Sequence, residues 1–168
     1  FIAFISLICL PIYSFLFKDN ILIKLSLGAP ISLIIIGIVS WLAFFVLKEI
    51  YISYLFSITA ITIIFLFWLY KNRHDFFSIF NYKLLFFLIF LIITHLLFIS
   101  IRGFNGDLIG TEKLMDQMML SSAFYSSNGS VPDLWFSGYQ NPYYYFAYWI
   151  YGGFIKLSGI HLTIGYNL

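Results

Sequence analysis

Carboxylates gather in one polar stretch of an otherwise apolar chain. Four of the seven acidic residues lie between positions 102 and 141, namely Asp107, Glu112, Asp116 and Asp133. A carboxylate in such a stretch can act as a general base, bind a metal ion or remain a solvated charge. Two cations, Arg102 and Lys113, stand among them. Residues 102–141 are therefore where the sequence concentrates side chains able to do chemistry.

Aromatic residues accompany these charges. Trp135 ends the motif PDLW at positions 132–135, and Tyr143, Tyr144 and Tyr145 open the motif YYYF at positions 143–146. Tyr and Trp collect at membrane interfaces, and their rings also stack on sugar faces and donate hydrogen bonds. Two interpretations thus stay open for these rings, an interfacial belt and a wall of a binding site.

The composition indicates a membrane protein. Hydrophobic residues make up 62% of the chain and charged residues 10%, against about 25% charged in a soluble domain. A net charge of +2 gives no argument for a nucleic-acid partner. Cys9 is the single cysteine, which excludes an internal disulfide and a thiolate metal cluster. The partner that the composition predicts is the lipid bilayer.

Charge-free runs predict the elements that position the polar stretch. Each run approaches the roughly 20 apolar residues of a transmembrane helix, or is a clipped part of one. The runs are residues 1–17, 25–47, 50–70 and 84–101, a fifth that begins near Tyr143 and ends around Lys156, and the start of another at 163–168. Lys48 and Glu49 alone separate the second run from the third, which predicts a tight helical hairpin. The fold predicted is an all-α polytopic bundle of about five spans plus the start of a sixth.

The distribution of Lys and Arg predicts the orientation. One side of the bundle would carry Lys18, Lys24, Lys71, Arg73, Lys83 and Lys156, and the other Lys48, Arg102 and Lys113. Cytoplasmic loops are the richer in Lys and Arg. The loop of residues 102–141 is therefore predicted to be extracytoplasmic, in a protein of the cell membrane.

Part of this loop is predicted to be an interfacial helix over residues 111–125. Thr111 can cap it, and Leu114, Met115, Met118 and Tyr125 share one face. Such a helix lies flat in the membrane plane with its apolar face toward lipid or protein. Asn141 and Pro142 then predict the start of the following span. Between the interfacial helix and this span, residues 126–130 predict a flexible turn.

Taken together, these motifs resemble the YYY membrane proteins of bacteria and archaea. The resemblance rests on Arg102, Asn105 and Asp107, then GTEKLMD at 110–116, PDLW and NPYYYF, and it reaches residues 166–168. It departs from the family pattern at Gly106, Leu114 and Ala147. The YYY proteins are placed among membrane glycosyltransferases of the GT-C type. The resemblance implies two parts, N-terminal membrane helices at 1–82 and the start of a GT-C-like core at 83–168.

What the resemblance implies is sugar transfer from a polyprenyl-phosphate donor at the outer membrane face. Such a transfer needs a carboxylate to take the acceptor's proton, and cationic side chains or a divalent metal to hold the departing phosphate. Asp107 occupies the position expected of the base, with Glu112 and Asp116 as the next candidates. The expected substrate-binding residues are Arg102, Lys113, Asp133, Trp135, Tyr143, Tyr144 and Tyr145.

A second hypothesis is a polytopic protein without enzymatic activity, either a transporter subunit or a scaffold. His95 lies inside the run 84–101, and an ionisable residue at that depth marks a pathway or a pair by default. A neutral, hydrogen-bonded structural histidine is the alternative. The direction in which the loop carboxylates point discriminates the two functions.

Overall fold

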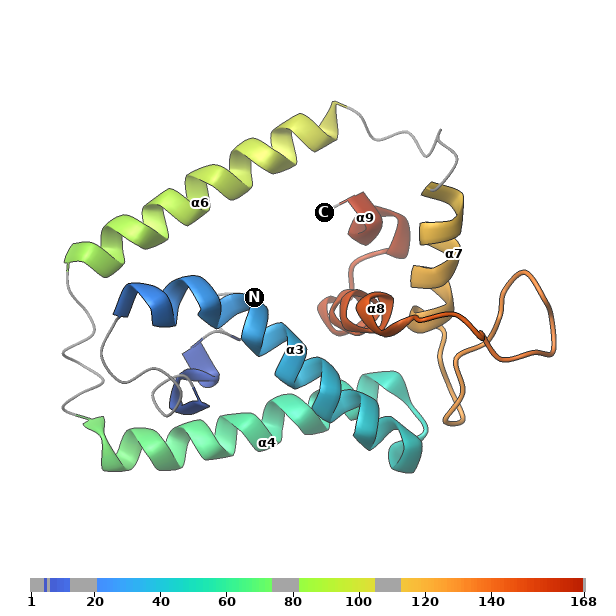
Figure 1. Ribbon diagram of the computed structural model, residues 1–168, viewed down its shortest axis with the longest axis horizontal. Helices are drawn as coiled ribbons and strands as arrows, with labels where there is room; N and C mark the ends of the chain where they lie inside the picture. The colour runs from blue at the N-terminus through green and yellow to red at the C-terminus, as the bar shows by residue number, and fades with distance from the viewer. Residues whose placement is uncertain (1–4, 6, 13–20, 74–81, 105–112, 168) are drawn as a thin grey trace.

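The computed structural model describes residues 5, 7–12, 21–73, 82–104 and 113–167, and Figure 1 shows them as helices joined by turns and loops. The named helices are α3 (Ile21–Leu47), α4 (Ile50–Lys71), α6 (Tyr82–Gly103), α7 (Lys113–Phe124), α8 (Phe146–Ser158) and α9 (Leu162–Asn167). Within the described ranges, pairing between extended residues is limited to isolated bridges. The predicted all-α class is confirmed.

Helices α3 and α4 form a hairpin closed by two residues. Lys48 adopts a left-handed conformation, with φ of 59°, and its N–H donates to the carbonyl of Phe44 at 2.9 Å. Glu49 follows in an extended conformation, with φ of −132°. A left-handed residue after the last turn is a common helix ending. The tight hairpin predicted at these two residues is confirmed.

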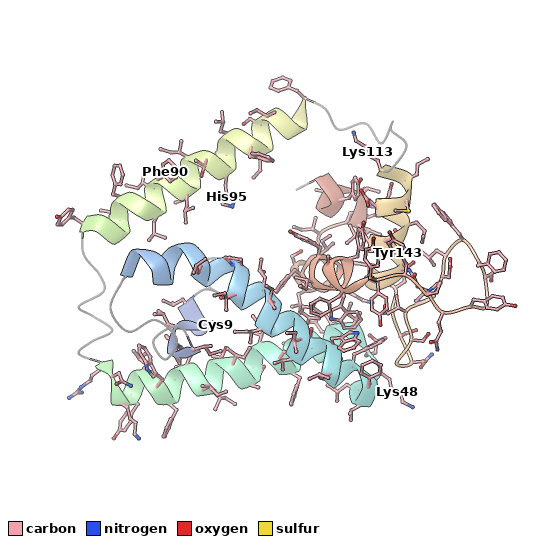
Figure 2. All side chains as sticks on the ribbon, viewed as in Figure 1. Cys9, Lys48, Phe90, His95, Lys113 and Tyr143 are labelled. Carbon is pink, nitrogen blue, oxygen red and sulfur yellow. The ribbon has the colours of Figure 1, made fainter. Side chains whose placement is uncertain are left out.

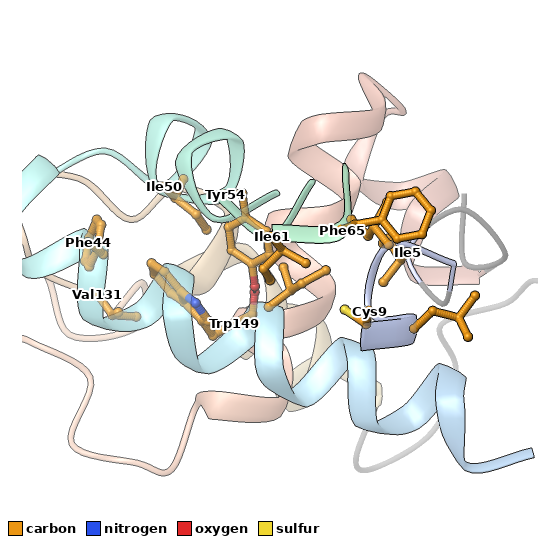
Figure 3. Packing of buried hydrophobic residues seen from close by; sticks show 12 residues of the cluster. Ile5, Cys9, Phe44, Ile50, Tyr54, Ile61, Phe65, Val131 and Trp149 are labelled. Atoms are coloured by element: carbon orange, nitrogen blue, oxygen red, sulfur yellow. The ribbon is translucent and has the colours of Figure 1, made fainter. Parts of the chain in front are cut away.

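The core lies where α8 meets this hairpin, and Trp149 is its centre (Figure 3). Its ring is fully buried against Phe44, at 4.7 Å between centroids, and Tyr54, at 6.0 Å. The indole Nε1 donates to Ser40 Oγ at 3.1 Å, and the Tyr54 hydroxyl donates to the Trp149 carbonyl at 2.9 Å. Because a buried polar group without a partner is costly, these bonds fix how α8 sits on α3 and α4.

Glycines allow α8 to approach its neighbours closely. A Cβ at Gly153 would lie 2.0 Å from the Tyr54 ring of α4, and one at Gly152 would lie 3.2 Å from the Cβ of Ala123 in α7. A Cβ at Gly37 of α3 would lie 2.6 Å from the side chain of Ile150. Small residues at helix contacts are typical of proteins in lipid, where packing rather than water exclusion holds helices together. These contacts make α8 the element on which α3, α4 and α7 converge.

Helices α7, α8 and α9 together form what we call the α7–α9 layer. In Figure 1, α7 runs across the direction of α4 rather than along it. The helix predicted over residues 111–125 is confirmed for Lys113–Phe124, whereas its cap Thr111 lies outside the described residues. The face that α7 buries carries Met119, Leu120, Ser122 and Ala123.

The predicted apolar face of α7 is thus only partly the buried one. Met115 and Met118 are half-buried, while Leu114 and Tyr125 are exposed within the chain. The buried face lies one position further along because small Ser122 and Ala123 let α7 sit against Gly152. The prediction counted large apolar side chains and gave no weight to small ones.

The helix predicted to start at Asn141 and Pro142 begins later, at Phe146, so this prediction is wrong. The Asn141 Oδ1 accepts the N–H of Tyr143 at 2.9 Å, which favours a turn over a helix. Helix α8 therefore has 13 residues. At 1.5 Å per residue it is about 20 Å long, short of the roughly 30 Å hydrocarbon core. A full-length fifth span is not confirmed.

By length and composition, the described helices able to cross a membrane are α3, within Pro30–Leu47, and α4, over Ile50–Lys71. Helix α6 contains a shorter apolar stretch, Leu88–Ile101, and most of its described side chains are exposed. The described part of the first run, residues 5 and 7–12, includes helical turns that reach the core through Ile5, Ile8 and Cys9. The predicted boundary between residues 82 and 83 stays a prediction.

The turn of residues 126–130 contacts the turn between α3 and α4. Ser127 pairs with Glu49 in an isolated antiparallel bridge, and Val131 joins Phe44 and Ile50 in the core. Asn128 and Gly129 close a two-residue hairpin with φ of 55° and 76°, which Asn-Gly sequences favour. The segment predicted as a flexible turn is thus a closed hairpin, and it lies at the same end of the α3–α4 hairpin as Glu49.

Candidate functional site

Asp116 lies where the three helices of the α7–α9 layer meet. It is half-buried in the first turn of α7, and its Oδ1 accepts a short hydrogen bond from the hydroxyl of Tyr148 in α8. Among the described residues, none donates a hydrogen bond to its other oxygen, Oδ2. One carboxylate oxygen is therefore held in place while the other can accept a proton.

The same bond changes the acidity of Tyr148. Donation to Asp116 raises the pKa of Tyr148 to about 12, and partial burial contributes in the same direction. The charges of Asp116, Tyr143 and Tyr166 add further to the pKa. Tyr148 thus keeps its proton at neutral pH and remains a hydrogen-bond donor to the carboxylate.

Helix α9 also borders the site, through a contact with α7. The Tyr166 hydroxyl donates to the carbonyl oxygen of Lys113 at 3.3 Å, which ties α9 to the first residue of α7. Beneath these polar groups lies a small apolar cluster of Leu120, Ile155 and Leu162. Lys113 itself is half-buried and lies three residues before Asp116, on a neighbouring part of the same helix face. The site therefore combines a carboxylate, a cation and phenol hydroxyls.

The tyrosine run divides into two parts. Tyr143 and Tyr144 are exposed and stacked, with centroids 4.0 Å apart, and the Tyr143 hydroxyl donates to that of Tyr144 at 2.6 Å. This donation raises the pKa of Tyr143. Tyr145 turns the other way, and its hydroxyl accepts the indole N–H of Trp41 at 3.2 Å. Tyr143 (labelled in Figure 2) is near enough to Tyr148 to raise its pKa, whereas Tyr145 contributes to packing against the core.

Asp133 and Trp135 belong to a separate loop of residues 131–141. The Asp133 Oδ1 accepts the backbone N–H groups of Trp135 at 2.9 Å and Phe136 at 3.0 Å. A carboxylate used in this way frames a turn. Among the predicted site residues, Lys113 and Asp116 lie one turn apart in α7, and Tyr143 is near enough to Tyr148 to raise its pKa. Asp133 and Trp135 belong to the separate loop.

Other predicted site residues are not described. Asp107 and Glu112, two of the three predicted catalytic residues, lie outside the described ranges. Arg102 lies in the last turn of α6, and its side chain is likewise outside what the structure describes. Within the described residues, no cluster of three or more His, Cys, Asp or Glu side chains is arranged to hold a metal ion.

Two residues of the site were not predicted as such, Tyr148 and Tyr166. The motif YYYF predicts site residues at 143–145, whereas the phenol that bonds the carboxylate comes three residues later, inside α8. The spacing of Tyr148 from the preceding tyrosines carries no signal for this contact. The contact arises from the packing of α7 on α8, which a single sequence does not display.

His95 is exposed on α6, and its Nδ1 lies 2.8 Å from the carbonyl oxygen of Leu91 in the preceding turn. Figure 2 shows the ring on the side of α6 that faces the rest of the molecule. A ring nitrogen bonded within its own helix is what the structural interpretation of this residue predicts.

One family model matches the chain. It is DUF2298, described as an uncharacterized membrane protein, and the match covers residues 35–168, well over half of the sequence. No curated protein and no solved structure matches the chain. The matched range includes α4 and the whole α7–α9 layer.

Proposed function

The chain belongs to the DUF2298 family of uncharacterized membrane proteins, and on that premise we propose that it transfers a sugar from a polyprenyl-phosphate donor at the outer membrane face. The observation that carries the proposal is the Asp116 carboxylate, anchored through one oxygen by Tyr148 in a half-buried position. A general base must be fixed in place and keep an oxygen available for the proton that it takes. Asp116 meets both conditions.

The other two described acidic residues serve the fold. Asp133 frames a turn, and Glu49 closes the α3–α4 hairpin, where its carbonyl oxygen accepts the Ser53 hydroxyl at 2.6 Å. Asp107 and Glu112 remain candidates through their place in the motif. Among the described carboxylates, Asp116 is therefore the one that we assign as the base.

Four neighbouring residues supply the remaining chemistry. Lys113, one turn before Asp116, offers a cation at the phosphate that departs with the lipid. Tyr143 and Tyr144 expose stacked rings on which a sugar face can lie. The hydroxyl of Tyr148 positions the carboxylate. In the transfer, the acceptor hydroxyl loses its proton to Asp116, its oxygen bonds the anomeric carbon, and the polyprenyl phosphate leaves.

The membrane setting supports a lipid-linked donor. Helices α3 and α4 are long and apolar enough to span a bilayer, and the α7–α9 layer packs on them. A substrate whose lipid tail stays in the bilayer would present its phosphate at the membrane surface. A layer packed against spans can bring Lys113 to that phosphate, and Asp116 to the acceptor hydroxyl, without the donor leaving the membrane.

The test is sugar transfer by the full-length protein in proteoliposomes with a panel of polyprenyl-phosphate sugars. The wild type should transfer at least one sugar, and Asp116→Asn should lose roughly 10²–10⁴-fold in rate. Glu49→Gln is the matched control and should keep the wild-type rate, since its carboxylate has no role in the proposed chemistry. Solute flux across the proteoliposome without any transfer would favour the transporter alternative instead.

A further inference from the structure

The loop of residues 131–141 is held in shape by hydrogen bonds between its own residues. The Asn141 N–H donates to the Val131 carbonyl at 2.9 Å, and the Asp133 N–H donates to the Tyr139 carbonyl at 2.9 Å. The Tyr139 N–H donates to the Phe136 carbonyl at 3.1 Å, and Asp133 closes the turn with its side chain. Bonds at the base and across the tip hold the backbone in one conformation before any ligand arrives, which lowers the ordering cost of binding.

The aromatic side chains of this loop are exposed. Trp135 is 63% exposed, and Phe136 and Tyr139 are each 66% exposed. The last two rings meet edge to face at 5.4 Å between centroids. A loop this ordered that leaves three aromatic rings in solvent is a surface suited to contact.

The loop reaches away from the spans. Figure 1 shows it projecting past the turn between α3 and α4, on the side opposite the bodies of these helices. Aromatic residues of an interfacial belt lie level with the ends of spans, at the depth of lipid head groups. Rings held beyond that end would face the aqueous phase, and we infer from this position a water-borne ligand in place of lipid.

The surface is also uncharged. Residues 131–145 contain no Lys or Arg, and their single carboxylate, Asp133, already accepts two backbone N–H groups. The polar side chains beside the rings are neutral, namely exposed Ser137 and Gln140 and the hydroxyl of Tyr139. Protein-binding hot spots rely on Arg as well as aromatic residues, and anionic polymers require cations. Flat rings with neutral hydroxyl and amide groups instead match an uncharged sugar, which has apolar faces and a hydroxyl rim.

We propose that the 131–141 loop is a docking site for a neutral glycan, which acts as the acceptor of the transfer. The identity of the ligand as a saccharide rests on the proposed function. The loop connects to the site through Asn141, whose buried amide donates to the Met119 Sδ of α7 at 3.1 Å and whose Oδ1 holds Tyr143. A glycan on the rings would therefore be held by a segment attached to the helix that carries Asp116.

The experiment is calorimetric titration of the full-length protein in nanodiscs, without donor, with uncharged tetrasaccharides of glucose, mannose and galactose. Tetragalacturonate serves as the charged comparator. At least one neutral tetrasaccharide should bind saturably, and tetragalacturonate should not. Trp135→Ala should weaken binding about tenfold or more, and Trp135→Phe, which keeps a ring, should weaken it less. Tyr70→Ala changes an exposed tyrosine in the last turn of α4, far from the loop in sequence, and should leave binding unchanged.

The outcomes separate this inference from the proposed function. Asp116→Asn should bind the tetrasaccharide normally while transferring sugar roughly 10²–10⁴-fold more slowly. No binding by any neutral tetrasaccharide, or equal binding by Trp135→Ala, overturns the docking site even if transfer proceeds. Quenching of Trp135 fluorescence by brominated lipids places the loop in the bilayer and also overturns it. Normal binding with native transfer by Asp116→Asn leaves the docking site standing and contradicts the proposed base.

Discussion

A half-buried carboxylate such as Asp116 must be stabilised by its neighbours, and here a phenol does so. Tyr148 gives it one hydrogen bond, which anchors the side chain without adding a charge. Tyr148 therefore orients the carboxylate as an uncharged partner.

The ionisation of Tyr148 should make the stability of the fold depend on pH. Its pKa in the folded protein is about 12, whereas an ordinary tyrosine ionises near 10. The folded state thus holds the proton more tightly than the unfolded state. The stability due to this group should be complete below about pH 10 and should be lost as the pH rises toward 12.

The check is the ultraviolet absorbance of phenolate, measured as the difference between the wild type and Tyr148→Phe. This difference should titrate near pH 12. In Asp116→Asn, compared with the corresponding double variant, it should titrate closer to pH 10, because the charged acceptor is gone. An unchanged titration in Asp116→Asn would show that Asp116 does not hold Tyr148.

Among the elements, α8 determines how the layer meets the hairpin. Its two adjacent glycines face different partners, since Gly152 lies against α7 and Gly153 lies under the ring of Tyr54. Trp149, one turn earlier, occupies the core between α3 and α4. The position of Asp116 relative to the spans therefore depends on packing around α8.

Gly153→Ala should destabilise the protein by about 1–3 kcal/mol, because the added methyl would overlap the fully buried Tyr54 ring. Thermal unfolding in detergent measures the loss. Gly103→Ala is the matched control, since a Cβ there meets nothing within 4 Å, and alanine favours a helix more than glycine does. Equal melting temperatures for the two variants would show that α8 does not approach α4 this closely.

Lengthy apolar runs made α3, α4 and α6 predictable from sequence, because helices in lipid must satisfy their own backbone. The hairpin was also predictable, because two charged residues, Lys48 and Glu49, interrupt one long apolar run. The start of α8 was not, since Asn141 can cap a helix or form a turn, and the choice depends on the loop that Asn141 closes.

Within the candidate site, the sequence indicated Asp116, Lys113 and the tyrosine run through their common motif. It did not indicate that Tyr148 holds Asp116 or that Tyr166 holds Lys113, because both contacts join residues more than 30 positions apart. Small residues at 122–123 and 152–153 allow these helices to meet. Contacts of this kind depend on shape, which counts of hydrophobic side chains do not capture.

At the scale of the whole molecule, the α3–α4 turn and the α7–α9 layer lie at one end of the spans. The bridge between Glu49 and Ser127 fixes this arrangement. The excess of Lys and Arg on the opposite side predicts that this end is extracytoplasmic. Both the proximity of the turn to the layer and the side of the membrane on which they lie can be measured.

In a Cys9→Ser background, Glu49→Cys with Ser127→Cys should form a disulfide on mild oxidation, because residues paired in an antiparallel bridge are within reach of one another. Singly, each cysteine should react with an impermeant thiol reagent in intact cells. Arg73→Cys, just past the far end of α4, should react only after lysis. Reaction of Arg73→Cys in intact cells would reverse the orientation.

The most direct test of Asp116 as the base separates the rate of chemistry from donor binding. Steady-state sugar transfer by Asp116→Asn in proteoliposomes should show kcat lowered by roughly 10²–10⁴-fold, with the KM for the polyprenyl-phosphate sugar nearly unchanged. This pattern is expected because the carboxylate interacts with the acceptor proton in the transition state and not with the bound donor. A native kcat in a folded Asp116→Asn protein would contradict the assignment.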